Sequence, residues 1–226
     1  MLLAVSGASG KTGWRVAQEA LARGYQVRAL VRPGSPLPEG LAGAEVIRLE
    51  LTNRPALEAA LRGCDALVIA TGARPSVDLA APLKVDAFGV RSQIEACQGV
   101  GLQRVVLVSS LCAGLWLHPL NLFGLILVWK RLGEHWLEQS GLEITVVRPG
   151  GLKESEVDLD QQQLRFSGPD QQREGSIPRR LVARVCLDAL ETPASIGRIV
   201  EITSAAESSL DGGTTSTAAS LAAWLA

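Results

Sequence analysis

An excess of charge of one sign is missing from this 226-residue sequence, because 22 Lys and Arg stand against 23 Asp and Glu. Without a net positive field, binding to nucleic acid or to an anionic membrane surface is disfavoured. Charged residues make up 20% of the chain and hydrophobic residues 47%. This composition excludes a disordered or collagen-like chain and predicts a globular one.

Cysteine and histidine are also sparse. The four cysteines, Cys64, Cys97, Cys112 and Cys186, form no C-x-x-C pair and lie near no histidine pattern that suits zinc. We therefore expect free thiols, no metal site, and a soluble protein in a reducing, cytoplasmic compartment.

One long segment lacks charge altogether. Residues 105–129 contain no Lys, Arg, Asp or Glu and are long enough to span a bilayer. However, Ser109-Ser110, His118-Pro119 and Asn121 make the middle polar and break a helix there. The segment fits a buried strand, a loop and a helix start better than a membrane helix, so no membrane span is expected.

Short apolar runs alternate with segments of helical periodicity along most of the chain. The runs predict strands at residues 2–5, 26–31, 46–51, 66–70, 104–108, 143–147 and 199–202. The periodic segments predict helices at residues 12–23, 54–61, 83–98, 129–139, 177–191 and 221–225. Nearly all-apolar strands separated by helices are typical of a parallel sheet that is covered on both faces.

We therefore predict an α/β fold, a single doubly wound parallel-sheet Rossmann domain over residues 1–204 that includes the substrate cleft at the carboxyl ends of its strands. The polar stretch 153–175 is expected to form a surface excursion near that cleft. A small C-terminal extension, residues 205–226, is expected to consist of a low-complexity linker and a short terminal helix.

The strongest functional signal is the turn Gly7-Ala8-Ser9-Gly10-Lys11-Thr12-Gly13, between the first strand and the first helix. Glycines at intervals of three let backbone N–H groups approach a pyrophosphate, whose charge the positive end of the helix dipole stabilises. An apolar strand before the turn and an amphipathic helix after it are the context that dinucleotide binding requires. We expect Gly7, Ser9, Gly10, Lys11, Thr12 and Gly13 to bind the cofactor.

Two other interpretations of the turn were weighed. The phosphate-binding loop of nucleoside triphosphatases also ends in Gly-Lys-Thr, but it requires a glycine where this sequence has Val5. A tight turn without a ligand stays open, because glycine clusters serve turns in general.

The residue after the second strand bears on the choice between NAD and NADP. An acidic residue there would bind the ribose diol of NAD. The strand instead runs into Arg32, and the nearest carboxylate, Glu39, comes later. We expect the Arg32 guanidinium to hold the 2′-phosphate of NADP(H); a solvated surface charge is the alternative.

Further motifs combine with the turn and Arg32 to indicate a family. They are Val-Leu-Val-Ser-Ser at 106–110, His-Pro-Leu-Asn at 118–121, Trp-Lys-Arg at 129–131 and Arg-Pro-Gly-Gly-Leu at 148–152. With them, the sequence resembles the atypical short-chain dehydrogenases/reductases and, within these, the NmrA-like NAD(P)H-binding group. It is especially similar to small plant and cyanobacterial NADP-binding members, over residues 1 to about 204.

The resemblance implies roles for individual residues. Ser9 to Gly13 would hold the pyrophosphate and Arg32 the 2′-phosphate. Thr71 and Gly72 would line the cofactor after the fourth strand, Lys130 would bond the nicotinamide ribose, and Pro149 and Gly150 would flank the nicotinamide.

The family's usual catalytic tyrosine, four residues before its lysine, is missing. Ile126 occupies that position, and the single tyrosine, Tyr25, lies at the start of the second strand, opposite the cleft. Ketone reduction, which needs a proton as the alkoxide forms, is therefore in doubt. The candidate catalytic residues are Ser109, His118 and Lys130, although His118 could simply bond to backbone in its loop.

Flavins and quinones place a smaller demand on the site, because their reduced anions can take a proton from solvent. The leading hypothesis is an oxidoreductase that transfers hydride from NADPH to a flavin, a quinone or a similar planar acceptor. The alternative is a non-catalytic NADPH-binding redox sensor or assembly protein with a protein partner. Epimerase or dehydratase activity ranks below both, and the oligomeric state stays open.

An apolar loop follows the fifth strand. Its large side chains are Trp116, Leu117, Leu120, Leu122 and Phe123. They could wall an acceptor pocket, contact a partner or fill the core.

Overall fold

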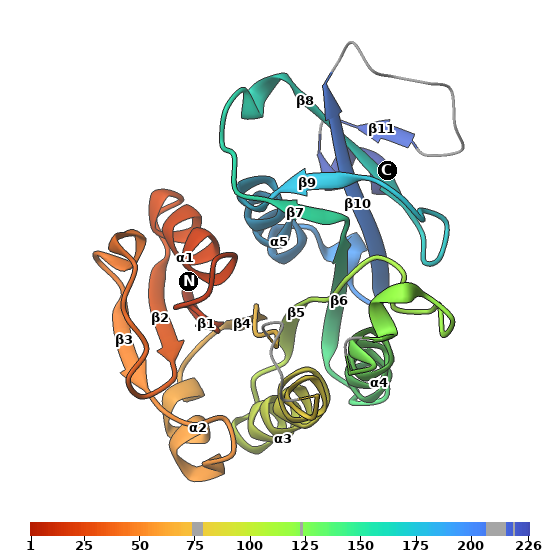
Figure 1. Ribbon diagram of the computed structural model, residues 1–226. Coiled ribbons are helices and arrows are strands. Elements are labelled where there is room, and N and C mark those ends of the chain that lie inside the picture. Colours follow the sequence, from red (N-terminus) through yellow and green to blue (C-terminus); the bar gives the residue numbers. More distant parts are fainter. Residues whose placement is uncertain (74–78, 123, 207–215, 219) are drawn as a thin grey trace.

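The computed structural model of the chain describes residues 1–73, 79–122, 124–206, 216–218 and 220–226 (Figure 1). At its centre is a sheet with the strand order β11-β8-β10-β6-β5-β4-β1-β2-β3. The parallel strands are β1 (Leu2–Ser6), β2 (Gln26–Val31), β3 (Glu45–Arg48), β4 (Ala66–Ile69), β5 (Arg104–Val108), β6 (Glu143–Pro149) and β10 (Arg198–Ala206). The order β3-β2-β1-β4-β5-β6 is that of the doubly wound dinucleotide-binding fold, which confirms the predicted fold class.

Helices cover both faces of this sheet (Figure 1). One face carries α1 (Gly13–Ala22) and α5 (Arg179–Glu191); the other carries α2 (Arg54–Leu61), α3 (Gly89–Val100) and α4 (Ile126–Glu138). Successive strand residues point to opposite faces, so a strand covered on both sides must be apolar throughout. In β4, Val68 belongs to the core beneath α1 and α5, whereas its neighbours Leu67 and Ile69 belong to the core of the other face.

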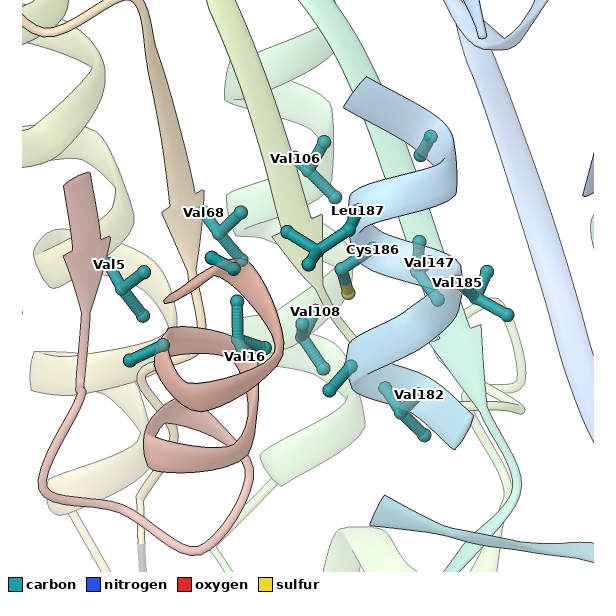
Figure 2. Close-up of a cluster of buried hydrophobic side chains, with 14 of the residues drawn as sticks. Val5, Val16, Val68, Val106, Val108, Val147, Val182, Val185, Cys186 and Leu187 are labelled. Carbon is teal, nitrogen blue, oxygen red and sulfur yellow. The ribbon is translucent and has the colours of Figure 1, made fainter. Parts of the chain in front are cut away.

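The core beneath α1 and α5 is shown in Figure 2. Val16 of α1 and Leu187 of α5 lie against Val68 and Val108 of the central strands, and all four are buried. Each fully buried side chain of this size contributes about 1.5–3 kcal/mol to folding. Since both faces of the central strands are covered, the carboxyl ends of the strands are the part of the sheet open to a ligand.

Two predicted elements differ from the observed ones in a way that affects the site. The predicted helix 83–98 is divided into a π-helix, η2 (Leu83–Phe88), and the α-helix α3. Helix α4 begins at Ile126, three residues before the predicted start, after Leu125 in the left-handed conformation with φ of 55°. The residue directly before α4 is the apolar Leu125, and the side chain that bonds to the first turn is Asn121, four residues earlier, so no local capping pattern marked this start.

The polar stretch 153–175, expected to be a surface excursion, contains sheet structure. Strand β8 (Gln162–Ser167) lies antiparallel between β10 and β11 (Ser216–Ala218), while β7 (Gly151–Lys153) pairs with β9 (Ser176–Pro178). Because β8 is mostly polar, it lacks the apolar run by which the other strands were recognised. Short 3-10 helices complete the chain at Glu39–Leu41, Pro119–Leu122, Leu159–Gln161 and Pro193–Ser195.

The described part of the C-terminal segment packs on the rest of the fold. The helix α6 (Leu221–Leu225) contributes Leu221 to the core beneath α5, and the ring of Trp224 stacks on Phe166 of β8 with centroids 5.8 Å apart. The predicted linker is thus partly structured, since β10 continues to Ala206 and β11 follows. Most of residues 208–217 lie outside the described residues.

Among the described residues, none of the helices has both the length and the apolar character needed to cross a bilayer. The four cysteines are unpaired thiols, and three of them are buried.

We expect Leu221→Ala to lower the free energy of unfolding by about 2–5 kcal/mol, because it opens a cavity in a fully buried contact of α6. Urea unfolding measures the change, and the exposed neighbour Ala222→Ser provides the control, with an effect within about 0.5 kcal/mol. Equal effects of the two variants would show that α6 lies outside the cooperative fold.

Candidate cofactor-binding site

The glycine turn is held by contacts between main-chain atoms. Gly7 has φ of 75°, and the N–H of Gly10 donates to the carbonyl oxygen of Gly7 at 2.8 Å. A Cβ on Gly13 would overlap the Gly7 carbonyl, and one on Gly7 would lie 2.8 Å from the carbonyl oxygen of Ala70, after β4. The turn therefore requires glycine at positions 7 and 13.

The turn delivers an uncapped helix end to the carboxyl edge of the sheet. Thr12 precedes α1 without a side-chain cap, and the first turn of α1 contains no acidic residue. The N-terminal amides and the positive pole of this ten-residue helix can therefore stabilise an anion, as the predicted pyrophosphate site requires.

Three buried hydroxyl groups at the same edge have no hydrogen-bond partner within the described chain. They are Oγ of Ser6, Oγ1 of Thr71 and Oγ of Ser109, which follow or end the neighbouring strands β1, β4 and β5. A buried polar atom without a partner costs about 1–3 kcal/mol, so such atoms mark a place where a polar ligand supplies the missing bonds. A dinucleotide fits the glycine cradle and these hydroxyls.

A hollow of about 360 Å³ lies beyond the end of β2. Ser9, Arg32, the segment 33–36 and Glu50 line it. Arg32 is exposed, and in the described part of the chain its guanidinium forms no hydrogen bond or ion pair. The predicted residues Ser9 and Arg32 thus share one hollow, of a size that suits the adenosine end of a dinucleotide.

Glu50 is a lining residue that sequence reasoning missed. It follows β3, whose end lies beside the end of β2 in the parallel pair, so the fold brings its carboxylate near Arg32. An acidic residue near the end of the third predicted strand, residues 46–51, was the available signal. Its charge opposes a 2′-phosphate, whereas Arg32 attracts one.

Lys130 of α4 forms an ion pair with Asp86 of η2. Its Nζ lies 2.8 Å from Asp86 Oδ1, and the N–H of Ala73 donates to Asp86 Oδ2 at 3.1 Å. A Cβ added to Gly72 would lie 3.7 Å from Asp86 Oδ1 and 3.8 Å from Lys130 Nζ. The predicted residues Gly72 and Lys130 are therefore adjacent, and Asp86 joins them although no sequence motif indicated it.

Glu154 connects the glycine turn to α5. It forms ion pairs with Lys11 at 3.0 Å and with Arg179 at 2.9 Å, and Arg179 also donates to the hydroxyl of Thr12. Its partial burial alone would raise the pKa of Glu154, but hydrogen bonds from Lys11 and Arg179 lower it below its ordinary value. Two of the predicted pyrophosphate residues thus bond to protein groups.

The other predicted residues have partners of their own. His118 accepts a hydrogen bond at Nδ1 from the N–H of Leu120, and no contact with Lys130 is found among the described residues. Gly150 is buried, and a Cβ there would lie 2.6 Å from the carbonyl oxygen of Gly175. Pro149 ends β6, and its carbonyl accepts the N–H of Leu111. The contact of Pro149 and Gly150 with the nicotinamide stays a prediction.

The single tyrosine lies at the opposite edge of the sheet. Tyr25 directly precedes β2, and its hydroxyl donates to Glu191. Burial, together with the carboxylate of Glu191, raises the pKa of Tyr25 to about 12. Ile126 begins α4 one turn before Lys130. The described residues thus place no phenol beside Lys130.

The apolar loop after β5 is exposed. Trp116 is 70%, Leu117 99% and Leu122 84% exposed to solvent, while Phe123 lies outside the described residues. Asn121 fixes this loop, because its side chain donates to the carbonyl of Trp116 and accepts the N–H of Leu127 in α4. Core filling is thus wrong for these three side chains.

A network of charged side chains, centred on Arg148, connects α4 to the sheet. The guanidinium of Arg148 in β6 bonds to Glu134 of α4, to Asp170 and to Glu201 of β10. Burial alone would lower the pKa of Arg148, but the hydrogen bonds and charge of Glu134, with the other two carboxylates, raise it. This network fixes the helix that carries Lys130.

We expect Gly72→Ala to weaken NADPH binding by about 10-fold or more, because the added methyl group would occupy the backbone surface beside Lys130 and Asp86. The methyl group makes only ordinary contacts in the protein itself, so the stability should stay within about 0.5 kcal/mol. Calorimetric titration and thermal unfolding measure the two effects. Unchanged NADPH affinity would contradict a cofactor at Gly72.

Comparison with known proteins agrees with this geometry. The family model described as NAD(P)H-binding matches residues 7–193. An uncharacterized chloroplastic protein of Arabidopsis thaliana is 38% identical, covering 90% of this chain and 76% of its own length. Sanguinarine reductase of Eschscholzia californica is 29% identical, with 83% of each chain covered. The chloroplastic Protein TIC 62 of Arabidopsis thaliana is 30% identical over 67% of this chain and 27% of its own.

Among solved structures, a protein of Bacillus halodurans described as an NAD-dependent epimerase/dehydratase superposes with a TM-score of 0.82. It is 28% identical and is covered to 95%, against 91% of this chain. The match of the family model spans the glycine turn, the hollow beside Arg32 and the Lys130 ion pair. The chain belongs to the NAD(P)H-binding family of Rossmann proteins, within the atypical short-chain dehydrogenases/reductases.

Proposed function

We propose that the chain binds NADP(H) and transfers hydride from NADPH to a flavin, a quinone or a similar planar acceptor. The observation that carries this proposal is the edge of the sheet at which the glycine turn, the uncapped start of α1 and the Arg32 hollow meet. The name of sanguinarine reductase, a relative over most of the chain, supports a reductase.

The preference for NADP(H) rests on two guanidinium groups. Arg32 is unpaired within the described residues and faces the hollow that Ser9 shares. Arg48 lies beside it, because its guanidinium donates to the carbonyl oxygens of Arg32 and Ser35. Two positive charges can outweigh the single carboxylate of Glu50 when a 2′-phosphate carries nearly two negative charges.

At the nicotinamide end of the site, the protein's side chains can orient the ribose and the acceptor, but none of those in the described part of the chain is a strong acid. NADPH supplies the hydride when bound. Lys130 and the hydroxyls of Thr71 and Ser109 hold the ribose and the acceptor, while His118 is the candidate proton donor through Nε2, since its Nδ1 accepts a backbone hydrogen bond. Without a phenol, acceptors whose reduced form takes a proton from solvent suit the site better than ketones.

A second candidate function is NADPH binding without turnover, with a protein partner. The missing phenol and the exposed side chains of Trp116, Leu117 and Leu122 favour it. The relationship to Protein TIC 62 is consistent with a regulatory or assembly role. We propose a reducing compartment for either function, on the four unpaired thiols; the cytoplasm fits, but several relatives are chloroplastic.

We expect Arg32→Ala to weaken NADPH binding by roughly 10-fold or more and NADH binding by less than about 2-fold, because only NADPH carries the 2′-phosphate. Glu50→Gln should strengthen NADPH binding and leave NADH nearly unchanged, since it removes an opposing charge from the same hollow.

Calorimetric titration of both cofactors measures these effects. Arg62→Ala, an exposed arginine at the end of α2, is the charge-matched control. Equal losses for NADPH and NADH in Arg32→Ala would refute the choice of NADP(H).

We expect the wild-type protein to oxidise NADPH with a flavin or a quinone and to be at least about 100-fold slower with simple ketones, because it lacks a positioned acid. The absorbance of NADPH reports turnover across such a panel. His118→Gln should slow turnover without changing NADPH affinity. Tight NADPH binding with no turnover of any acceptor would favour the second candidate function.

A further inference from the structure

We propose that Asp86 is a positioning residue, which holds the ammonium group of Lys130 at the place where the nicotinamide ribose binds. The inference rests on the proposed binding of NADP(H) and adds a residue to that site. It starts from the ion pair between Lys130 Nζ and Asp86 Oδ1, at 2.8 Å, next to the backbone of Gly72.

Close packing of two helices creates this pair. Gly133 lies on α4 three residues after Lys130, and a Cβ at this position would overlap the carbonyl oxygen of Asp86. Because Gly133 has no side chain, α4 can approach η2 until backbone meets backbone. Lys130, nearly one turn earlier on α4, then reaches the carboxylate of Asp86.

The carboxylate itself is fixed from the other side. Asp86 belongs to a π-helical turn, a rare geometry that occurs frequently at functional sites. Its Oδ2 accepts the N–H of Ala73, which follows the end of β4, and its side chain is only 2% exposed. Oδ1 is therefore held toward Lys130, and the pair is tied to the loop that carries Thr71 and Gly72.

Stability alone does not account for this arrangement. Removing a carboxylate and an ammonium from water is costly, and apolar replacements of buried ion pairs are often neutral or stabilising. Lys130 uses one of its three N–H donors for Asp86 and keeps an exposed fraction of 14%. Within the described part of the chain, two donors thus stay available for ribose hydroxyls.

Asp86 contributes to cofactor binding by ordering the side chain of Lys130 in advance. A lysine side chain has many rotamers, and a ligand that binds it must otherwise restrict them. Asp86 restricts Lys130 before the cofactor arrives, so part of the entropic cost of binding is removed. Asp86 itself is too deeply buried to be a contact for the cofactor, so it acts through Lys130.

The test compares two ligands that share the adenosine end. NADPH contains the nicotinamide ribose, whereas adenosine 2′,5′-bisphosphate ends before it and occupies only the hollow of Arg32 and the turn. Calorimetric titration of both ligands is carried out on the wild type, Asp86→Asn, Lys130→Met and the double variant. Asparagine keeps the shape of Asp86 and the bond from Ala73, but it removes the charge.

We expect Asp86→Asn to weaken NADPH binding roughly 5- to 20-fold and to leave adenosine 2′,5′-bisphosphate within about 2-fold. Lys130→Met should give the same selective loss. The double variant should be no weaker than Lys130→Met, because Asp86 acts only through Lys130.

Three results would overturn the inference while NADP(H) binding stands: unchanged NADPH affinity in Asp86→Asn, equal losses for both ligands, or losses that multiply in the double variant. If the wild type binds neither ligand, the proposed function fails and this inference fails with it. Should Asp86→Asn not fold, Asp86→Glu keeps the charge and displaces the carboxylate by one methylene, and the same selective loss for NADPH is expected.

Discussion

The contact of main chain with main chain at the glycine turn is the constraint on which the rest of the site depends. Gly13 lies against the carbonyl of Gly7, and Gly7 lies against the segment after β4. These approaches set where α1 begins and how near its first amides come to the ends of β1 and β4. The unpartnered hydroxyls of Ser6 and Thr71 lie at the same strand ends, so a shift of the turn would separate the groups that a dinucleotide has to reach together.

Charges around the turn are only partly balanced within the protein. Glu154 pairs with Lys11 and Arg179, and Glu156 pairs with Arg15 and Arg180. Two carboxylates thus face four basic side chains, and the positive charge that is left over favours an anion at the turn. A pyrophosphate bound at the proposed site would compete with Glu154 for Lys11, so these ion pairs would affect both the affinity of the site and its dependence on salt.

The sequence predicted the parts of the site that are encoded by neighbouring residues. The turn 7–13, the second strand and Arg32 form continuous signals, and the structure has β1, α1 and β2 there. Glu50 and Asp86 reach the site only through the pairing of β3 with β2 and the packing of η2 on α4. These contacts join residues far apart in the chain, so no motif indicated Asp86, and the acidic character of Glu50 near the end of the third predicted strand was the one available signal. Strand β8 was missed for a different reason, since Leu164 and Phe166 are its only apolar residues and form no apolar run, although Phe166 is buried in the core and β8 pairs with β10.

The buried guanidinium of Arg148 fixes the helix that carries Lys130. It joins α4, the loop around Asp170 and β10 through three carboxylates, and Glu201 in turn accepts the N–H groups of Asp170, Gln171 and Gln172. By contrast, the segment from Arg32 to Pro36 is largely exposed and is held by few hydrogen bonds. If the adenosine end binds at residues 32–36 as proposed, adjustment to different coenzymes falls to this exposed segment, and mutation there would change coenzyme preference while the geometry at the reacting end is conserved.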